Sequence, residues 1–144
     1  MNKIEVIKSE RDGLTVRDMI AHYAQAGWEA IPEDDIQRLK WYGLFLRNPT
    51  PGHFMLRVRL PGGQTTSAQL ETLADIAQQY GNGVVDVTTR QQVQLRHLTI
   101  AHVPPVFSKL EEAGLTSLQT GMDTVRNIMT CPVAGLNPNE LLDG

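Results

Sequence analysis

The stretch HFMLRVRL, residues His53–Leu60, decides the fold because apolar and more polar positions alternate along it. The apolar set is Phe54, Leu56, Val58 and Leu60, and the opposite set is His53, Met55, Arg57 and Arg59. A period of two is typical of a β-strand with one buried face. Pro61-Gly62-Gly63 follows and predicts a turn. The segment is therefore expected to form a half-buried strand that presents two arginines on its polar face.

Helical and strand patterns follow this strand. Thr66-x-x-Gln69 has the spacing of a capping box, and the helical stripe behind it ends at Gly81. Short apolar runs predict strands at residues 84–88, 93–98 and 116–120, and Pro104-Pro105 opens a second helix that ends near Gly114. The order strand, helix, strand, strand, helix, strand is the ferredoxin-like βαββαβ arrangement, so we expect an α+β fold.

Residues 1–46 predict a short helical N-terminal arm. Its first 14 residues are polar and are expected to be mobile. Thr15 is the candidate N-cap of a helix that stops at Gly27, and a second short helix is expected from residue 32 to 39. The turn-rich RNPTPG, Arg47–Gly52, separates this arm from a half-domain and the start of a following segment, residues 47–144.

Composition limits the possible classes of protein. The chain has 144 residues, a net charge of −3 and 41% hydrophobic residues, which suits one domain with a real core. It contains no apolar run of the roughly 18 residues that span a bilayer, and its start resembles no signal peptide, so no membrane partner is expected. The single cysteine, Cys131, fits a reducing cytoplasm and cannot supply the roughly four thiolates of an iron–sulfur cluster.

Arginine is concentrated in three runs although the chain is acidic. These runs contain Arg57 and Arg59, then Arg90 and Arg96, then Arg126. Guanidinium groups bind carboxylates and small oxyanions bidentately, so their gathering indicates a pocket for a ligand with several anionic groups. Solvated surface arginines are the alternative, and Arg126 is as well suited to pairing with Asp123 as to binding a ligand.

Other chemistries find little support in the sequence. The four histidines show no metal-ligand spacing, so no metal site is predicted, and Cys131 before Pro132 is typical of an inert thiol. RNA-binding ferredoxin-like domains carry basic strands with exposed aromatic residues. Here the predicted strands contain only Phe54, on the apolar face, and the chain is acidic, so no nucleic-acid partner is expected.

Four motifs, in one order, carry a family resemblance. They are WYGLFLRNPTPGHFMLRVRLPGG, the helix TTSAQLETLADIAQQYG, DVTTRQQVQLRH, and AGLTSLQTGMDTVRNIMTCPVAGLNPNELLDG. From Trp41 to Leu142 the chain resembles the N-terminal part of the siroheme-dependent nitrite and sulfite reductases. The residues of TPGHFMLRVRLPGG and of LTSLQTGMDTVRN resemble those of ferredoxin-dependent nitrite reductases, which are enzymes of nitrate assimilation, more than those of the sulfite reductases.

The resemblance implies a cofactor and roles for particular arginines. Such enzymes carry siroheme bridged to a 4Fe-4S cluster and reduce nitrite to ammonia, or sulfite to sulfide, with electrons from ferredoxin or another donor. Arg57 and Arg126 would be catalytic: Arg57 would help bind siroheme and lie over the substrate face, and Arg126 would reach the bound anion. Arg90 and Arg96 would contact siroheme carboxylates. Residues 47–144 would then include the start of the siroheme-contacting segment.

The resemblance also implies a missing partner. The family site needs a lysine-bearing segment and two cysteine pairs that lie beyond Gly144, so the chain alone is not expected to catalyse the reduction. We expect the N-terminal portion of a ferredoxin-type nitrite reductase that shares siroheme with a C-terminal half. The alternatives are a portion of a sulfite reductase and a non-catalytic siroheme-binding or interaction domain.

An isolated half of this kind is expected to expose an apolar docking surface and to self-associate. Sedimentation velocity over a range of concentrations would then show species larger than the 16.0 kDa monomer. A stable, monodisperse monomer at every concentration would contradict this prediction.

Overall fold

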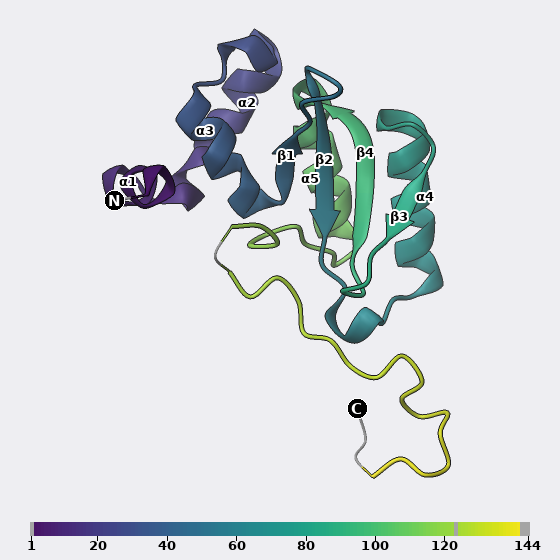
Figure 1. Ribbon diagram of the computed structural model, residues 1–144. Helices are drawn as coiled ribbons and strands as arrows, with labels where there is room; N and C mark the ends of the chain where they lie inside the picture. Colours follow the sequence, from purple (N-terminus) through teal and green to yellow (C-terminus); the bar gives the residue numbers. More distant parts are fainter. Residues whose placement is uncertain (1, 123, 142–144) are drawn as a thin grey trace.

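The strand predicted at residues 53–60 lies inside a four-stranded antiparallel sheet (Figure 1). The computed structural model describes residues 2–122 and 124–141. The sheet has the order β1-β2-β4-β3, and its strands are β1 (Leu44–Leu46), β2 (His53–Val58), β3 (Val85–Val87) and β4 (Val93–Thr99). Every neighbouring pair is antiparallel.

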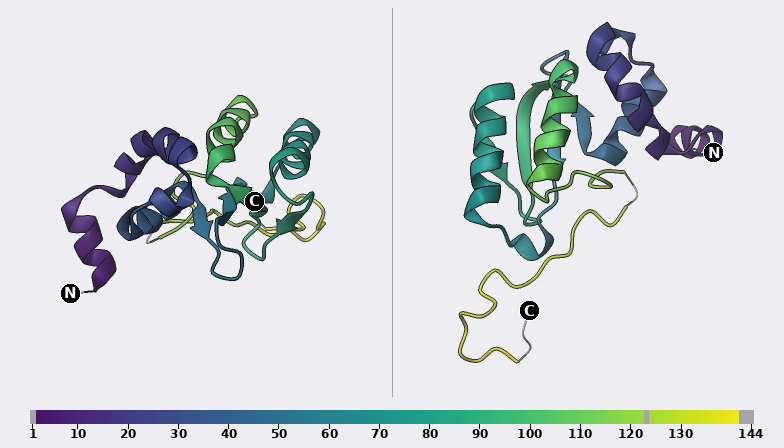
Figure 2. Two further views of the ribbon diagram at one scale, coloured as in Figure 1. Left: turned by 90° about the horizontal axis from the view of Figure 1, so that it is seen from above. Right: turned by 180° about the vertical axis from the view of Figure 1, so that it is seen from behind.

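Two helices cover one face of the sheet and leave the other face without a helix (Figure 2). They are α4 (Ser67–Tyr80), which begins with the predicted capping box at Thr66, and α5 (Val103–Glu112). The residues at the centre of the core come from both layers: Phe54, Leu56, Val58, Leu73, Ile76, Leu95, Leu98, Val106 and Leu110. The α+β, ferredoxin-like fold predicted from the alternating patterns is therefore confirmed.

A β-bulge in β4 sets the pattern of side chains on the two faces. Phe54 pairs with Leu98 and Leu56 pairs with Leu95, so two residues of β4, Arg96 and His97, lie opposite one residue of β2. His97 adopts a left-handed backbone conformation with φ 61°. This extra residue keeps both leucines in the core.

The strand predicted at residues 116–120 is wrong, and β1 supplies the fourth strand instead. Only Thr116 forms a bridge, opposite Arg59, and a turn follows it. The reason is that β1 occupies the free edge of β2, and the pairing continues from β1 to Gly43, whose carbonyl accepts the Arg57 N–H at 2.9 Å. Gly43 has φ 74°, and a Cβ there would lie 2.5 Å from Thr120 Oγ1, so this close crossing requires glycine.

The N-terminal arm contains a helix already at Lys3–Glu10, within the first 14 residues, where the sequence pattern predicted no regular structure before Thr15. The α-helices are α1 (Lys3–Glu10), α2 (Arg17–Ala26) and α3 (Glu33–Arg38), and short 3-10 turns span Gly13–Val16, Trp28–Ala30 and Leu39–Tyr42. Asn2 caps α1 and Ile7 is buried, which the polar composition concealed. The N-cap of α2 is Val16 rather than Thr15, while Gly27 ends that helix as predicted.

A buried carboxylate, Asp35 on α3, joins the segments of this arm. It accepts hydrogen bonds from the Tyr23 hydroxyl and from the guanidinium groups of Arg11 and Arg38. Arg38 also donates to the Ile7 carbonyl at 3.1 Å, which ties α3 to α1. Burial opposes the charge of Asp35, but the three hydrogen bonds outweigh it and lower its pKa below the ordinary value. Burial and the bond to Asp35 raise the pKa of Tyr23 to about 12.

Residues 121–141, where described, form no helix or strand and extend away from the sheet (Figure 1). They expose several large apolar side chains: Val125, Ile128, Met129, Val133, Leu136 and Leu141. Within the described part of the chain, no helix is both long and apolar enough to span a membrane. The apolar residues along this segment are consistent with the docking surface predicted above.

Replacement of Asp35 by Asn should destabilise the chain by about 3–5 kcal/mol, because it leaves the buried Arg38 with only the exposed Glu10 carboxylate, 3.9 Å away, as a charge partner. A carboxyl with a lowered pKa stabilises the fold above its unfolded pKa, and that contribution disappears as pH falls through the folded value. Urea unfolding should therefore show a loss of stability below about pH 5 in the wild type that the variant lacks. Asp34→Asn, on the same helix, is the matched control. Equal midpoints for Asp35→Asn and Asp34→Asn would contradict the prediction.

Candidate anion-binding site

Arg57 is the central cation of the open sheet face. It lies on β2, where its Nη1 donates to the Thr120 carbonyl at 2.8 Å and its Cζ lies 4.9 Å from the centre of the Phe45 ring on β1. These contacts hold the half-buried guanidinium against the sheet. Burial lowers the pKa of Arg57, and the positive charges of Arg126 and Arg90 lower it further. An arginine remains protonated at neutral pH even so.

Two of the predicted arginines, Arg126 and Arg90, thus act electrostatically on a third, Arg57. We call these three residues the arginine cluster. Arg90 lies in the turn between β3 and β4, which closes through the Thr88 N–H to the Gln92 carbonyl at 2.8 Å. Among the described residues, none of the three guanidinium groups forms an ion pair. Like charges held together in this way favour a bound anion. The predicted pairing of Arg126 with Asp123 lies outside the described residues.

The fourth predicted arginine, Arg96, has a different environment. It follows Gln94 on β4, at the bulge, and its Nε donates to the Asp86 carboxylate on β3. Its Nη2 donates to Gln94 Oε1 at 3.2 Å. Asp86 therefore balances the charge of Arg96, and Arg96 is not a member of the arginine cluster.

Arg59 binds backbone carbonyls of the loop that precedes Arg126. Its Nη2 donates to the carbonyls of Gln119 and Val125 at 2.8 and 2.9 Å. It therefore holds both ends of the loop that leads to Arg126. The alternation of residues 53–60 places Arg57 and Arg59 on one face of the strand but does not distinguish their roles. In the structure Arg57 donates to the Thr120 carbonyl and belongs to the cluster, whereas Arg59 donates to the loop that leads to Arg126.

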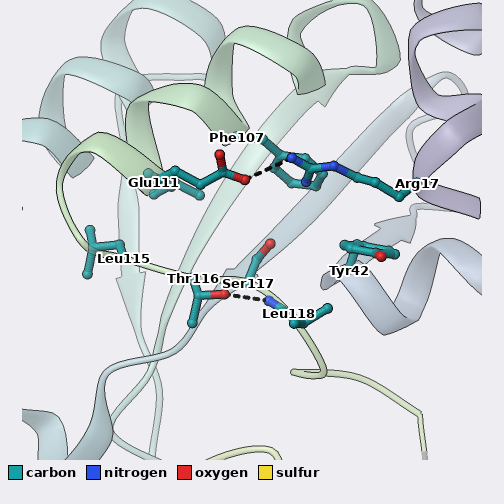
Figure 3. A pocket seen from close by; sticks show the side chains of 9 residues that line it. Arg17, Tyr42, Phe107, Glu111, Leu115, Thr116, Ser117 and Leu118 are labelled. Atoms are coloured by element: carbon teal, nitrogen blue, oxygen red, sulfur yellow. Dashed lines mark hydrogen bonds and ion pairs between the residues drawn. The ribbon is translucent and has the colours of Figure 1, made fainter. Parts of the chain in front are cut away.

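A separate pocket of about 250 Å³ lies between α2, α5 and residues 115–118 (Figure 3). Its cation, Arg17, lies over the Phe107 ring at 4.7 Å and pairs with Glu111 at 2.8 Å. Because this charge is already balanced, the pocket is a poor anion site. No cluster of three or more histidine, cysteine or acidic side chains suited to a metal ion occurs in the described part of the chain, and Cys131 is exposed.

The sequence reasoning missed the residues that position the cluster. Phe45 stacks on Arg57, Thr120 accepts its hydrogen bond, and the buried Gln92 contacts the backbone of Arg126. The adjacent glutamines of TTRQQ, directly before the predicted strand at 93–98, offered a signal, since a glutamine that becomes buried is seldom without a hydrogen-bond partner. Phe45 could not be found in this way because β1 was not predicted.

Comparison with known proteins relates this sequence and fold to a family. Residues 47–113 match the model of the nitrite/sulfite reductase ferredoxin-like half domain. This range includes β2, β3, β4, α4 and α5, and therefore Arg57 and Arg90. The chain belongs to the nitrite/sulfite reductase family and corresponds to the N-terminal part of its members.

The individual relatives include ferredoxin–nitrite reductases. The chain is 52% identical to a ferredoxin–nitrite reductase of Synechococcus elongatus and 48% identical to one of Leptolyngbya laminosa, with 99% of this chain and 28% of each relative covered. The structure of Mycobacterium tuberculosis NirA protein matches with a TM-score of 0.90 at 29% identity, over 99% of this chain and 29% of that chain. The chain therefore spans somewhat over a quarter of the length of these relatives.

The repulsion within the cluster can be measured in the isolated chain. Arg90→Gln should raise the melting temperature at low salt by roughly 1–2 °C, because it removes one of the like charges that face Arg57. The gain should vanish in 0.5 M salt, where the Debye length is only about 4 Å. Arg96→Gln is the control and should lower the melting temperature, since it breaks the pair with Asp86. A drop for Arg90→Gln, independent of salt, would contradict the cluster.

Proposed function

We propose that this chain supplies part of the siroheme and anion site of a ferredoxin-type nitrite reductase that reduces nitrite to ammonia. The observation that carries the proposal is the arginine cluster: the positive charges of Arg126 and Arg90 both act on the half-buried Arg57, and none of the three forms an ion pair among the described residues. The similarity to ferredoxin–nitrite reductases over nearly the whole chain supports the choice of substrate and donor.

The residues present fit a polycarboxylated tetrapyrrole. Siroheme carries many carboxylates around its rim, and guanidinium groups bind carboxylates through two parallel N–H···O bonds. Arg57 is partly desolvated and repelled by two neighbours, so an anion placed among them would relieve both penalties. Arg90, on an exposed turn, and Arg126 would bind rim carboxylates. Arg96 would contribute from β4 while keeping Asp86 as its partner.

When bound, siroheme supplies the iron at which nitrite receives electrons. The part played by this chain is electrostatic. Arg57 and Arg126 would attract nitrite and stabilise negative charge on its oxygens, and because guanidinium groups do not give up a proton in proteins they would act as fixed charges rather than as proton donors. Phe45 and the Thr120 carbonyl hold Arg57 in place, which limits the reorganisation needed during the reaction.

The chain lacks other parts of such a site. Its sequence contains one cysteine, so a 4Fe-4S cluster needs ligands from residues that these 144 do not include. We propose that these ligands come from the C-terminal part of the relatives, and that ferredoxin or another donor supplies the electrons. The exposed free thiol of Cys131 agrees with a reducing compartment such as the cytoplasm.

The proposal can be tested in a chimera that joins this chain to the remaining part of the Synechococcus elongatus relative. Arg57→Ala and Arg126→Ala should each lower kcat/KM for nitrite about 100-fold, because each removes a preorganised charge. Siroheme content, from absorbance, separates lost cofactor from lost turnover. Arg47→Ala, on the exposed β1–β2 turn, is the matched control.

The same chimera separates the alternatives. Turnover of sulfite in preference to nitrite would indicate a sulfite reductase portion. Siroheme binding without turnover of either anion would indicate a non-catalytic binding domain. Unchanged nitrite kinetics in both Arg57→Ala and Arg126→Ala would show that the site assignment is wrong.

A further inference from the structure

Arg126 lies in a segment without regular secondary structure, yet its backbone is held firmly. The side chain of Gln92, only 1% exposed, donates from Nε2 to the Arg126 carbonyl at 2.6 Å. Asn127, the next residue, donates from Nδ2 to the carbonyls of Arg90 and Leu60 at 2.8 and 2.9 Å. Hydrogen bonds at the Arg126 carbonyl and at the next residue thus attach this segment to the turn that carries Arg90.

A third contact continues this attachment. Gln91, at φ 54°, pairs its side-chain amide with the backbone of Thr130: Nε2 donates to the carbonyl at 2.9 Å, and Oε1 accepts the N–H at 3.1 Å. The Gly62 N–H donates to the Ile128 carbonyl at 2.9 Å. We call Gln91, Gln92 and Asn127 the amide latch.

The latch acts against electrostatic repulsion. It joins the segments that carry Arg90 and Arg126, and the positive charges of both arginines disfavour the charge of Arg57. It also contains an energetic defect, since Asn127 Oδ1 is buried and finds no hydrogen-bond donor in the described structure. A buried acceptor without a donor destabilises the folded chain. A connection selected for stability alone would avoid both penalties, whereas a ligand site that must be formed before binding tolerates them.

We infer that Gln92 is a positioning residue, which with Asn127 fixes Arg126 beside Arg90 and Arg57 before any anion binds. This rests on the proposed anion site. Gln92 is buried, and its side-chain amide is used on the Arg126 carbonyl. It acts through the Arg126 backbone, so its removal should matter only as far as Arg126 contributes to binding.

The test uses the full chain and a metal-free polycarboxylated porphyrin as the probe, followed by fluorescence. Gln92→Met keeps the length of the side chain but removes the donor, and it should weaken binding about tenfold because Arg126 is no longer held. Gln78→Met, an exposed glutamine on α4, should leave the affinity unchanged. Asn127→Ala is the second variant and should act in the same direction.

A double-mutant cycle separates positioning from a general loss of structure. Adding Gln92→Met to Arg126→Ala should cost little further affinity, whereas adding it to Arg57→Ala should cost the full tenfold. A variant that merely unfolds would weaken binding equally in both backgrounds. Equal, additive losses in the two cycles, or unchanged binding by Gln92→Met, would overturn the inference.

Hydrogen exchange tests the latch without the ligand. In Gln92→Met the amides of Gly62 and Thr130 should exchange roughly tenfold faster, while those that pair β2 with β4 keep their protection. Unchanged exchange at both amides would overturn the inference. If the wild-type chain fails to bind the porphyrin, the proposed function fails, and the exchange result still decides whether Gln92 positions Arg126.

Discussion

The antiparallel pairing of β2 with β4 is the constraint on which the rest of the structure depends. It joins the strand that carries Arg57 to the strand that begins just after the Arg90 turn. Its bulge keeps Leu95 and Leu98 in the core on either side of Arg96. The helices on one face bury the apolar side chains, and this leaves the opposite face free to gather cations.

The candidate site illustrates how an acidic protein holds a local concentration of positive charge. The chain pairs most of its other described arginines: Arg11 and Arg38 with Asp35, Arg17 with Glu111, and Arg96 with Asp86. The arginine cluster differs because backbone carbonyls and amide side chains hold it, rather than carboxylates. Neutral partners fix the position of a cation without cancelling its charge, so the charge remains available to a ligand.

The pairing of segments also explains how residues far apart in this chain are held at the candidate site. Arg59, Gln91, Gln92 and Asn127 attach residues 119–130 to the end of the sheet. Beyond them the chain exposes apolar side chains such as Leu136. The chain spans about 28% of the length of the nitrite reductases that it resembles. Order at the arginines and exposed apolar groups beyond them are what we expect where a site is shared with further chain.

Local pattern determined much of this protein. Alternation at residues 53–60 predicted β2, the capping box predicted α4, and the crowding of arginines in an acidic chain predicted an anion site. Each of these signals arises from residues that are close together in the chain, so each can be recognised in the sequence alone. Tertiary structure decided the rest. Leu44–Leu46 became a strand because it pairs with one edge of β2, and residues 116–120 are excluded from that edge because β1 occupies it. Arg96 differs from Arg90 because Asp86 lies across the sheet from Gln94. Such outcomes depend on pairings between residues far apart in the chain, and local spacing carries no record of them.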